Sequence, residues 1–553
     1  MNPEPSGTAE LQPDDSQRAF VRRTAVMSVA TSLSRITGFL RVSATAFALG
    51  VAGTRLATAY TVANNTPNIV YELILGGILT SVFVPVFVEW LQDRGREEAW
   101  DVARSVLSIA FVILAAVTLL TVLGAPWIIR LYTVGDSGPG AQAARDFATF
   151  CLRLFMPQIV FYGIGAVITG LLNAHRRFAV PMFAPILNNL IVIGTMAAFV
   201  AFSSLPSGVE PRPENITSLQ RWILALGTTL GVVGMTVALW PSLRRVGFRF
   251  RWRLEWGHPA VRRVARLALW TFVYVVVNQL GLLVVIVLAT GSNGYFAYTS
   301  AFILFQLPHA IFAVSIFTAL LPAMATRWTN GDREGFRDQL SQGIRATAVI
   351  LIPAALGMLV LATPLVRLVI QHGAANQQDT RLVSGILVFF ALGLFSFSLF
   401  QLLLRAFYAM QDTRTPALVN IAAVGLNTAV NFVYFFSLHL GVRGLALGHA
   451  TAYTFGSVVM LILIRGRLGG LDGRRVLSTL ARTLVAGAGT ALVAWAAAEG
   501  LARALGTASV ATQVLQVFGA TGAGLLAFLL AALMLRIDEV DAVRRQLIAR
   551  WRA

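Results

Sequence analysis

Long apolar segments follow one another along almost the whole chain, and they constrain its fold more than any other feature. A helix that crosses a membrane needs about twenty mostly apolar residues. Charged residues make up only 12% of the 553 residues, about half of what a soluble surface requires. The expected spans are residues 24–50, 67–90, 105–129, 148–172, 179–202, 219–241, 265–290, 295–325, 342–367, 382–408, 416–438, 441–464, 478–498 and 512–535. We therefore predict an all-α integral membrane protein with fourteen transmembrane helices.

The distribution of arginine predicts how these spans are oriented. All 44 basic residues are arginine, and cytoplasmic loops are richer in basic residues than outer loops. With a cytoplasmic N-terminus, the cytoplasmic segments contain thirty-two arginines and the outer segments contain nine. This asymmetry predicts a multi-pass protein of the bacterial cytoplasmic (inner) membrane with both termini in the cytoplasm. It also accounts for the net charge of +19 without a nucleic-acid partner, and the basic run at 244–266 is suited to contact membrane lipids.

An internal repeat divides the spans into two groups of six. The segment around Pro85 resembles the one around Pro322, and the segment around Pro126 resembles the one around Pro364, at an offset near 237 residues. Each group has an even number of spans, so the two lobes are expected to be related by a pseudo-two-fold axis along the membrane normal. Transporters built in this way bind substrate between the lobes and alternate its access to the two sides. The expected parts are a disordered cytoplasmic tail at 1–23, an N-terminal lobe at 24–241, a basic cytoplasmic linker at 242–264, a C-terminal lobe at 265–466, and an added pair of spans with a cytoplasmic tail at 467–553.

Four charged residues lie inside the predicted spans, where an ionisable group is costly unless it faces a cavity or a partner. Arg35 and Arg41 lie in the first span, Glu72 in the second, and Arg153 at the start of the fourth. Three arginines against one carboxylate favour a positively charged cavity, because guanidinium groups suit phosphate or diphosphate oxygens. The other interpretation is that Glu72 pairs with one arginine while the others extend to the membrane surface. With two amides near the outer mouth, the candidate substrate-binding residues are Arg35, Arg41, Arg153, Glu72, Asn65 and Asn68.

Several kinds of chemistry are not expected from this sequence. Because the chain has no lysine, it lacks a Walker A lysine, and we do not expect ATP-driven transport within it. Cys151 is the single cysteine, and the six histidines have no metal-binding spacing. We therefore predict no metal site, no cofactor and no enzymatic activity.

Five strings of the sequence resemble one known family. SRITGFLR lies in the first span, PNIVYELILGGILTSVFVPVF in the second, and LLNAHRRFAVPMFAPILNN across the fourth and fifth. QLPHAIFAVSIFTALLPAMAT lies in the eighth span, and LLLRAFYAMQDTRTPALV extends from the tenth into the eleventh. The strings run collinearly over residues 24–466 and resemble the MurJ (MviN) family of lipid II flippases, within the multidrug/oligosaccharidyl-lipid/polysaccharide exporter superfamily.

The resemblance implies both a cargo and a site. It implies that the protein moves lipid II, an undecaprenyl-diphosphate-linked disaccharide-pentapeptide, to the outer leaflet for peptidoglycan synthesis. It also implies that Arg35, Arg41 and Arg153 bind the diphosphate in a central cavity, and that the last two spans help to form a groove for the lipid tail. At five positions where the family carries charge, this chain has Val42, Thr58, Tyr71, Gly76 and Ile303.

Two other functions remain open on the sequence. A drug/cation antiporter of the same superfamily needs intramembrane carboxylates, and Glu72 is the candidate in this chain. A non-transporting scaffold of cell-wall assembly would tolerate charge removal in the cavity and would bind cell-wall synthesis proteins through its loops or tail. For a flippase, the energy is expected to come from an ion gradient, the membrane potential or downstream consumption of the cargo.

Overall fold

A computed structural model describes most of the chain, and every regular element in the described part is helical. The described residues are 13–52, 54–75, 87, 89, 93, 95–175, 177–206, 209–255, 259–541 and 544–545. The helices of the first half are α1 (Pro13–Leu49), α2 (Leu56–Leu75), α4 (Arg96–Tyr132), α5 (Ala141–Phe155), α6 (Gln158–Ala174), α7 (Ala179–Ala201), α8 (Ser218–Val237) and α9 (Trp240–Arg245).

The second half repeats this succession and adds two helices. Its elements are α10 (Pro259–Gly291), α11 (Tyr295–Pro308), the π-helical turn η2 (His309–Ala313), α12 (Val314–Thr329), α13 (Arg333–Ile370), α14 (Gln377–Leu392), α15 (Leu394–Ala409), α16 (Arg414–Phe432), the π-helical turn η3 (Val433–Ser437), α17 (Val442–Arg467), α18 (Gly473–Leu505) and α19 (Val510–Met534).

Eleven of the expected spans coincide with helices that can cross a membrane. Among the described residues, ten helices are long and apolar enough, and the pair α14 and α15, bent by 47°, makes an eleventh. The other expected spans are 24–50, 67–90 and 265–290. Polar residues interrupt α1, residues 76–86 lie outside the described part, and the described apolar stretch of α10, Val275–Gly291, is shorter. The all-helical membrane fold is confirmed, and the exact number of fourteen stays a prediction.

The disordered tail expected at residues 1–23 is described only in part, and it stays a prediction. The helix α1 begins at Pro13, so it includes the second half of the expected tail at 1–23, whereas residues 1–12 lie outside the described part.

The succession of helices repeats as the sequence predicts. The long helices α4 and α13 have 37 and 38 residues and contain Pro126 and Pro364, respectively. A broken pair follows each of them: α5 and α6 meet at Pro157, and α14 and α15 meet at Gly393. Two helices that pack against each other then follow in each half. They are α7 and α8 in the first half, and α16 and α17 in the second. The boundaries at 241 and 264 stay predictions.

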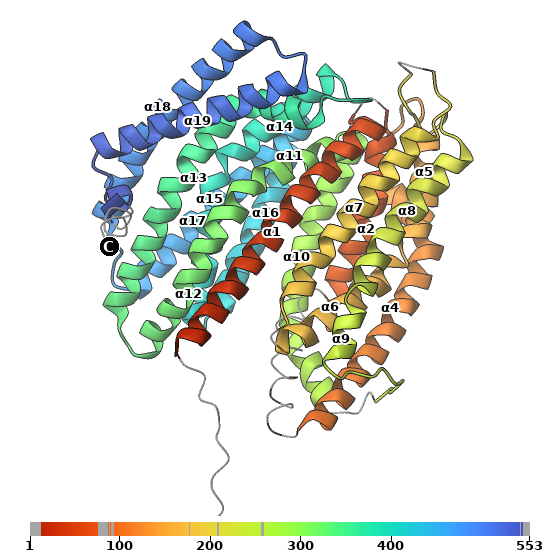
Figure 1. Ribbon diagram of the computed structural model, residues 1–553, viewed down its shortest axis with the longest axis horizontal. Coiled ribbons are helices and arrows are strands. Elements are labelled where there is room, and N and C mark those ends of the chain that lie inside the picture. The colour runs from red at the N-terminus through yellow and green to blue at the C-terminus, as the bar shows by residue number, and fades with distance from the viewer. Residues whose placement is uncertain are drawn as a thin grey trace, which may run out of the picture.

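The two added helices pack on one side of the molecule. α18 and α19 pack against each other and against α13, and Figure 1 shows them at the edge of the second half. Arg345 on α13 forms ion pairs with Glu539 after α19, at 2.5 Å, and with Asp472 before α18, at 3.7 Å. These pairs hold the ends of the added helices against the C-terminal lobe.

The two halves meet at the end of the bundle where α1, α7, α10 and α13 end, and diverge toward the other end (Figure 1). At the meeting end, Asn293 donates a hydrogen bond to the carbonyl of Ala52. The amide of Ala52 donates to Asp379, with a distance of 3.1 Å. Asp379 also caps α14 by accepting from the amide of Asn376, whose side chain donates to Glu210 at 3.3 Å. The cap of α14 therefore also positions a contact between the halves.

Candidate functional site

A cavity of about 310 Å3 lies between α1, α7 and α11. It contains both arginines that the sequence places inside the first span. Their spacing of six residues separates them by about 120° around the helix, so a cavity that both line must wrap around part of α1. The lining residues are Thr31, Ser34, Arg35, Gly38, Phe39, Arg41, Met182, Ile303, Gln306 and Leu307.

The charge of this cavity is positive. No aspartate or glutamate is among its lining residues. Within the described part of the chain, neither Arg35 nor Arg41 forms an ion pair with a carboxylate. Two cations that line one cavity without a lining carboxylate repel each other and attract negative charge, so the cavity is suited to receive an anion.

Two residues of the C-terminal lobe, His309 and Arg405, interact with the arginines of this region, and neither was among the predicted site residues. His309, in the π-helical turn after α11, interacts electrostatically with Arg405 and with Arg35. Its Nδ1 lies 2.8 Å from the Ser398 hydroxyl on α15. The guanidinium of Arg405 lies 4.9 Å from the centre of the Phe317 ring. The pattern that marks Arg405 is a lone arginine in the apolar run LLLRAF.

Glu72 and Asn65 lie at contacts between the two lobes. The Gln279 side chain on α10 donates a hydrogen bond of 2.7 Å to the Glu72 carboxylate on α2. The Asn65 side chain donates to the Tyr295 hydroxyl at the start of α11, at 3.2 Å. Glu72 thus has an amide partner and not one of the arginines that we considered for it. Both contacts join α2 to the C-terminal lobe.

Asn68 belongs to a polar group around Arg41. Its side chain interacts with the hydroxyl of Tyr162 on α6, and Arg41 interacts electrostatically with the same hydroxyl. Arg41 also interacts with the hydroxyl of Tyr60 on α2, which lies 2.7 Å from the Thr228 hydroxyl. This network holds donors and acceptors beside the cavity.

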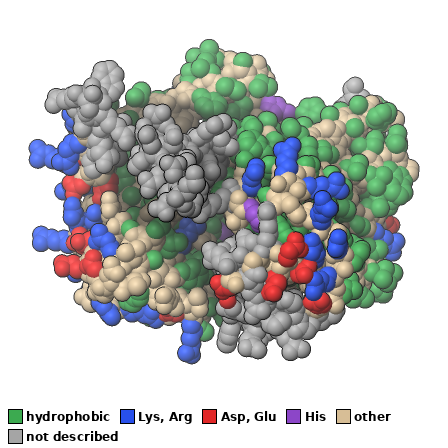
Figure 2. Space-filling view, turned by 60° about the horizontal axis from the view of Figure 1, so that its bottom comes forward, with side chains coloured by type: hydrophobic (Ala, Val, Ile, Leu, Met, Phe, Trp, Pro, Cys, Tyr) green, Lys and Arg blue, Asp and Glu red, His purple; other side chains and the backbone are tan. Residues whose placement is uncertain are grey.

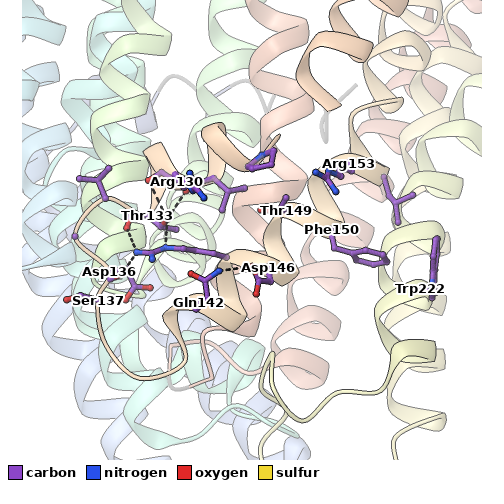
Figure 3. A pocket seen from close by; sticks show the side chains of 16 residues that line it. Arg130, Thr133, Asp136, Ser137, Gln142, Asp146, Thr149, Phe150, Arg153 and Trp222 are labelled. Atoms are coloured by element: carbon purple, nitrogen blue, oxygen red, sulfur yellow. Dashed lines mark hydrogen bonds between the residues drawn. The ribbon is translucent and has the colours of Figure 1, made fainter. Parts of the chain in front are cut away.

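Arg153 lies apart from the cavity that contains Arg35 and Arg41. It lines a separate pocket of about 830 Å3 between the end of α4 and α5, with Arg130 and Arg145 (Figure 3). Hydropathy placed Arg153 near the end of a span but could not tell which face of the helix it occupies.

The positions at which the family carries charge occupy different surroundings. Ile303 lines the cavity beside Arg35 and Arg41. Val42 is buried, and Thr58 donates a hydrogen bond of 3.2 Å to the Asn293 carbonyl in the contact between the lobes. Gly76 lies outside the described residues. The position at the cavity itself where the resemblance implies a charge therefore holds an apolar side chain, Ile303.

The described residues around the cavity do not form a candidate metal centre. Within the described part of the chain, no three histidine, cysteine, aspartate or glutamate side chains lie close enough together to hold a metal ion. Cys151, the single cysteine, is buried.

The fold and the positive cavity define a two-lobed, all-helical membrane transporter. The family model described as "Lipid II flippase MurJ" matches residues 45–536. The chain therefore belongs to the MurJ family of lipid II flippases.

Individual relatives agree with this assignment. A protein of Rhizobium meliloti named "Probable lipid II flippase MurJ" is 27% identical over 534 residues, which are 95% of this chain and 96% of the relative. The "Lipid II flippase MurJ" of Burkholderia cenocepacia is 28% identical over 457 residues, with 81% and 84% covered.

Solved structures agree at the level of the fold. The structure titled "Lipid II flippase MurJ, inward closed conformation" has a TM-score of 0.74 and 21% identity, and covers 93% of this chain and 100% of that chain. An inward-facing multidrug resistance MATE family transporter has a TM-score of 0.64 and 14% identity, with 81% and 98% covered.

Proposed function

We propose that the protein moves lipid II across the cytoplasmic membrane by alternating access. The observation that carries this proposal is the pair Arg35 and Arg41 in a cavity without a lining carboxylate. A diphosphate has oxygens that guanidinium groups bind as a fork, and Arg405 adds a third cation from the opposite lobe near His309. The relatives from both bacteria carry this function in their names.

The contacts between the lobes suggest how the cargo moves. The hydrogen bonds from Ala52 to Asp379 and from Asn293 to Ala52 close the end that the arginine distribution places outside. In this state the headgroup enters from the cytoplasmic side and its diphosphate binds the arginines, while the lipid tail stays in the membrane. Breaking the outer contacts and closing the inner end would then expose the headgroup outside.

The orientation in the membrane is also part of the proposal. Figure 2 brings the end at which α1 begins toward the viewer and shows arginine side chains around both halves. Because basic residues concentrate on the cytoplasmic side, this end faces the cytoplasm. Thr329→Cys, in a Cys151→Ser background, places an exposed thiol at this end. A membrane-impermeant thiol reagent should label it in inverted vesicles, and labelling in intact cells would reverse the orientation.

A cation-coupled mechanism has one observation in its favour. Glu72 is exposed, lies inside a predicted span and binds the opposite lobe through Gln279. Coupling through this carboxylate predicts that Glu72→Gln abolishes the dependence of transport on a Na⁺ or H⁺ gradient. Gradient dependence that survives in Glu72→Gln would exclude Glu72 as the coupling site.

The function is tested by complementation of a bacterial strain depleted of its own lipid II flippase, together with an assay for lipid II in the outer leaflet. The wild-type chain should restore growth and outer-leaflet lipid II. Arg41→Ala should lose both while its amount in the membrane stays unchanged. Arg503→Ala is the matched control, because Arg503 is highly exposed and far along the chain on the added helix α18.

Two results would contradict the proposal. A wild-type chain that inserts into the membrane but restores neither growth nor outer-leaflet lipid II would not be a lipid II flippase. Full activity of an Arg35→Ala, Arg41→Ala double variant would show that the cavity arginines do not bind the cargo, as a scaffold of cell-wall assembly would predict.

A further inference from the structure

The pocket around Arg153 has features of a second binding site. It lies between the last turns of α4 and the helix α5, outside the cavity between the lobes, and its volume is about 830 Å3. Pockets that bind small molecules commonly have volumes of about 300–1,000 Å3. Its polar lining residues are Arg130, Thr133, Asp136, Ser137, Gln142, Arg145, Asp146, Thr149 and Arg153.

Most of the charged groups around this pocket already have partners. Arg55 binds both carboxylate oxygens of Asp136, at 2.5 and 2.6 Å. Arg145 donates to the hydroxyl of Thr133 at 3.0 Å and to backbone carbonyls. The Gln142 amide donates to Asp146 at 2.8 Å. These side chains are therefore already engaged in contacts that stabilise the loop between α4 and α5.

Two guanidinium groups are left over. Within the described residues, the side chains of Arg130 and Arg153 have neither an ion pair nor a hydrogen bond, although both line the pocket and both are exposed in it. In Figure 3 both lie in the upper part of the view, Arg130 to the left of Arg153, and Asp146 lies below them. Two positive groups that line one pocket, and that no carboxylate among the described residues neutralises, attract an anion with several oxygens.

The surroundings place this anion at the surface of a bilayer. The pocket wall includes Phe150 and Trp222, whose rings meet edge to face at 5.1 Å. Trp127, in the last turns of α4, and Val134, in the turn after it, are 66% and 62% exposed. Tryptophan is enriched at the level of the lipid headgroups, and exposed apolar side chains beside it contact acyl chains. A free anion in water would not require this apolar flank.

We propose that the pocket binds the phosphate group of a membrane phospholipid headgroup through Arg130 and Arg153. The phosphate lies between the two guanidinium groups, and the acyl chains lie along the exposed apolar side of α4. This site is independent of the proposed transport function, because it lies outside the cavity between the lobes and needs no cargo. Arg153 accordingly holds a lipid of the surrounding bilayer.

The test is native mass spectrometry of the purified full-length protein in detergent, titrated with phosphatidylglycerol. The wild type should retain bound phospholipid. The double variant Arg130→Gln with Arg153→Gln should have an apparent affinity for phosphatidylglycerol that is at least tenfold lower. The double lysine variant should fall between them, because lysine keeps the charge but loses the fork. Arg503→Gln, at an exposed position of α18, should bind as the wild type does.

Further arms separate the phospholipid from other anions. Inorganic phosphate at millimolar concentration should leave the bound phospholipid in place, and complete displacement by it would overturn the proposal in favour of a free-anion site. Arg41→Gln should retain the phospholipid, whereas a loss equal to that of the double glutamine variant would assign the bound lipid to the central cavity. The unfolding temperature shows whether the double glutamine variant is correctly folded. If it is, and its affinity for phosphatidylglycerol equals that of the wild type, the proposal is also overturned.

Discussion

The Gln279 side chain on α10 donates a hydrogen bond of 2.7 Å to the Glu72 carboxylate on α2, so this amide joins the two lobes. The Oε1 atom of Gln279 is buried and has no partner among the described residues. The contact therefore depends on a single donor. A hydrogen bond to a charged group is worth about 1.5–3 kcal/mol when buried, and the exposed position of Glu72 reduces this contribution.

Gln279→Leu should therefore shift the protein away from the state described here. We expect the free energy that favours this conformation to fall by about 1 kcal/mol, which changes the equilibrium between conformations about fivefold. Spin labels at Arg245→Cys and Thr329→Cys, both exposed and at the end of the bundle where α1 begins, report the separation of the lobes in a Cys151→Ser background. Distance distributions that do not change in Gln279→Leu would show that the bond does not bias the equilibrium.

The sequence predicts the fold better than the site for a physical reason. Hydropathy, arginine asymmetry and the repeat depend only on distances along the chain, and they predict spans that coincide with the observed helices. The cavity depends on which face of a helix a residue occupies. Arg35 and Arg41 share a cavity, whereas Arg153 faces another pocket.

Contacts between distant segments could not be predicted. Glu72 and Gln279 are 207 residues apart, and no local pattern identifies the partner of an isolated carboxylate. Arg405 lies near the expected cytoplasmic end of the span 382–408. Arginine is common at such ends, so its position alone did not indicate a binding role. Only the packing of α15 beside the turn after α11 brings it toward His309.

Arg405→Gln should lower transport at least tenfold without changing the amount of protein in the membrane. Its guanidinium lies in the C-terminal lobe and interacts electrostatically with His309, which also interacts with Arg35. The loss of Arg405 therefore removes a cation that a diphosphate in the cavity would meet. One charge-assisted hydrogen bond contributes about 1.5–3 kcal/mol. Arg405→Lys should be intermediate, and Arg414→Gln, at an exposed position on α16, should be neutral. The measurement is the outer-leaflet assay for lipid II, and equal rates for Arg405→Gln and the wild type would contradict the assignment.

Gly393→Ala should destabilise the protein by about 2 kcal/mol, because the added methyl group would overfill a closely packed site. Gly393 lies at the bend between α14 and α15, and a Cβ atom there would lie 2.7 Å from both the Cα and Cβ atoms of Ala450 on α17. Thermal unfolding in detergent measures the effect. Gly425→Ala on α16 is the control, since nothing lies within 4 Å of the added atom, and it should be neutral or stabilising. Equal unfolding temperatures for the two variants would contradict the packing argument.

Asp412, in the loop between α15 and α16, should make stability depend on pH. Partial burial by itself would raise its pKa, but hydrogen bonds from Thr415 and the ion pair with Arg467 outweigh burial and hold the pKa below its usual range. A depressed pKa means that the carboxylate stabilises the folded state above the ordinary aspartate pKa of about 3.9. This stabilisation is lost as the pH falls through the lower pKa of the folded state.

The corresponding measurement compares the wild type with Asp412→Asn. The wild type should unfold at a higher temperature at pH 6, and the difference should shrink steadily between about pH 4 and pH 3, below the ordinary aspartate pKa. Because the other carboxylates titrate in both proteins, only the difference reports on Asp412. A difference that stays constant over this range would contradict the role of the Arg467 and Thr415 contacts.

Arg345→Met should weaken the attachment of the added helices. The Arg345 side chain is 9% exposed, and it binds Glu539 at 2.5 Å and the Ser341 hydroxyl at 2.8 Å. Glu539 is itself only 14% exposed, so removing the arginine leaves a largely buried carboxylate without its counter-ion. Breaking a buried pair in this way costs about 3–5 kcal/mol, which unfolding in detergent should reveal.

A double-mutant cycle separates the pair from its surroundings. Arg345→Met with Glu539→Met removes both charges, so the double variant should be more stable than Arg345→Met alone, because no buried charge is left over. Arg475→Met is the control, since its pair with Asp538 is 58% and 62% exposed with a separation of 3.6 Å, and exposed pairs contribute little. Strictly additive effects of the two substitutions would mean that Arg345 and Glu539 do not stabilise each other, and that this pair does not hold α18 and α19 on α13.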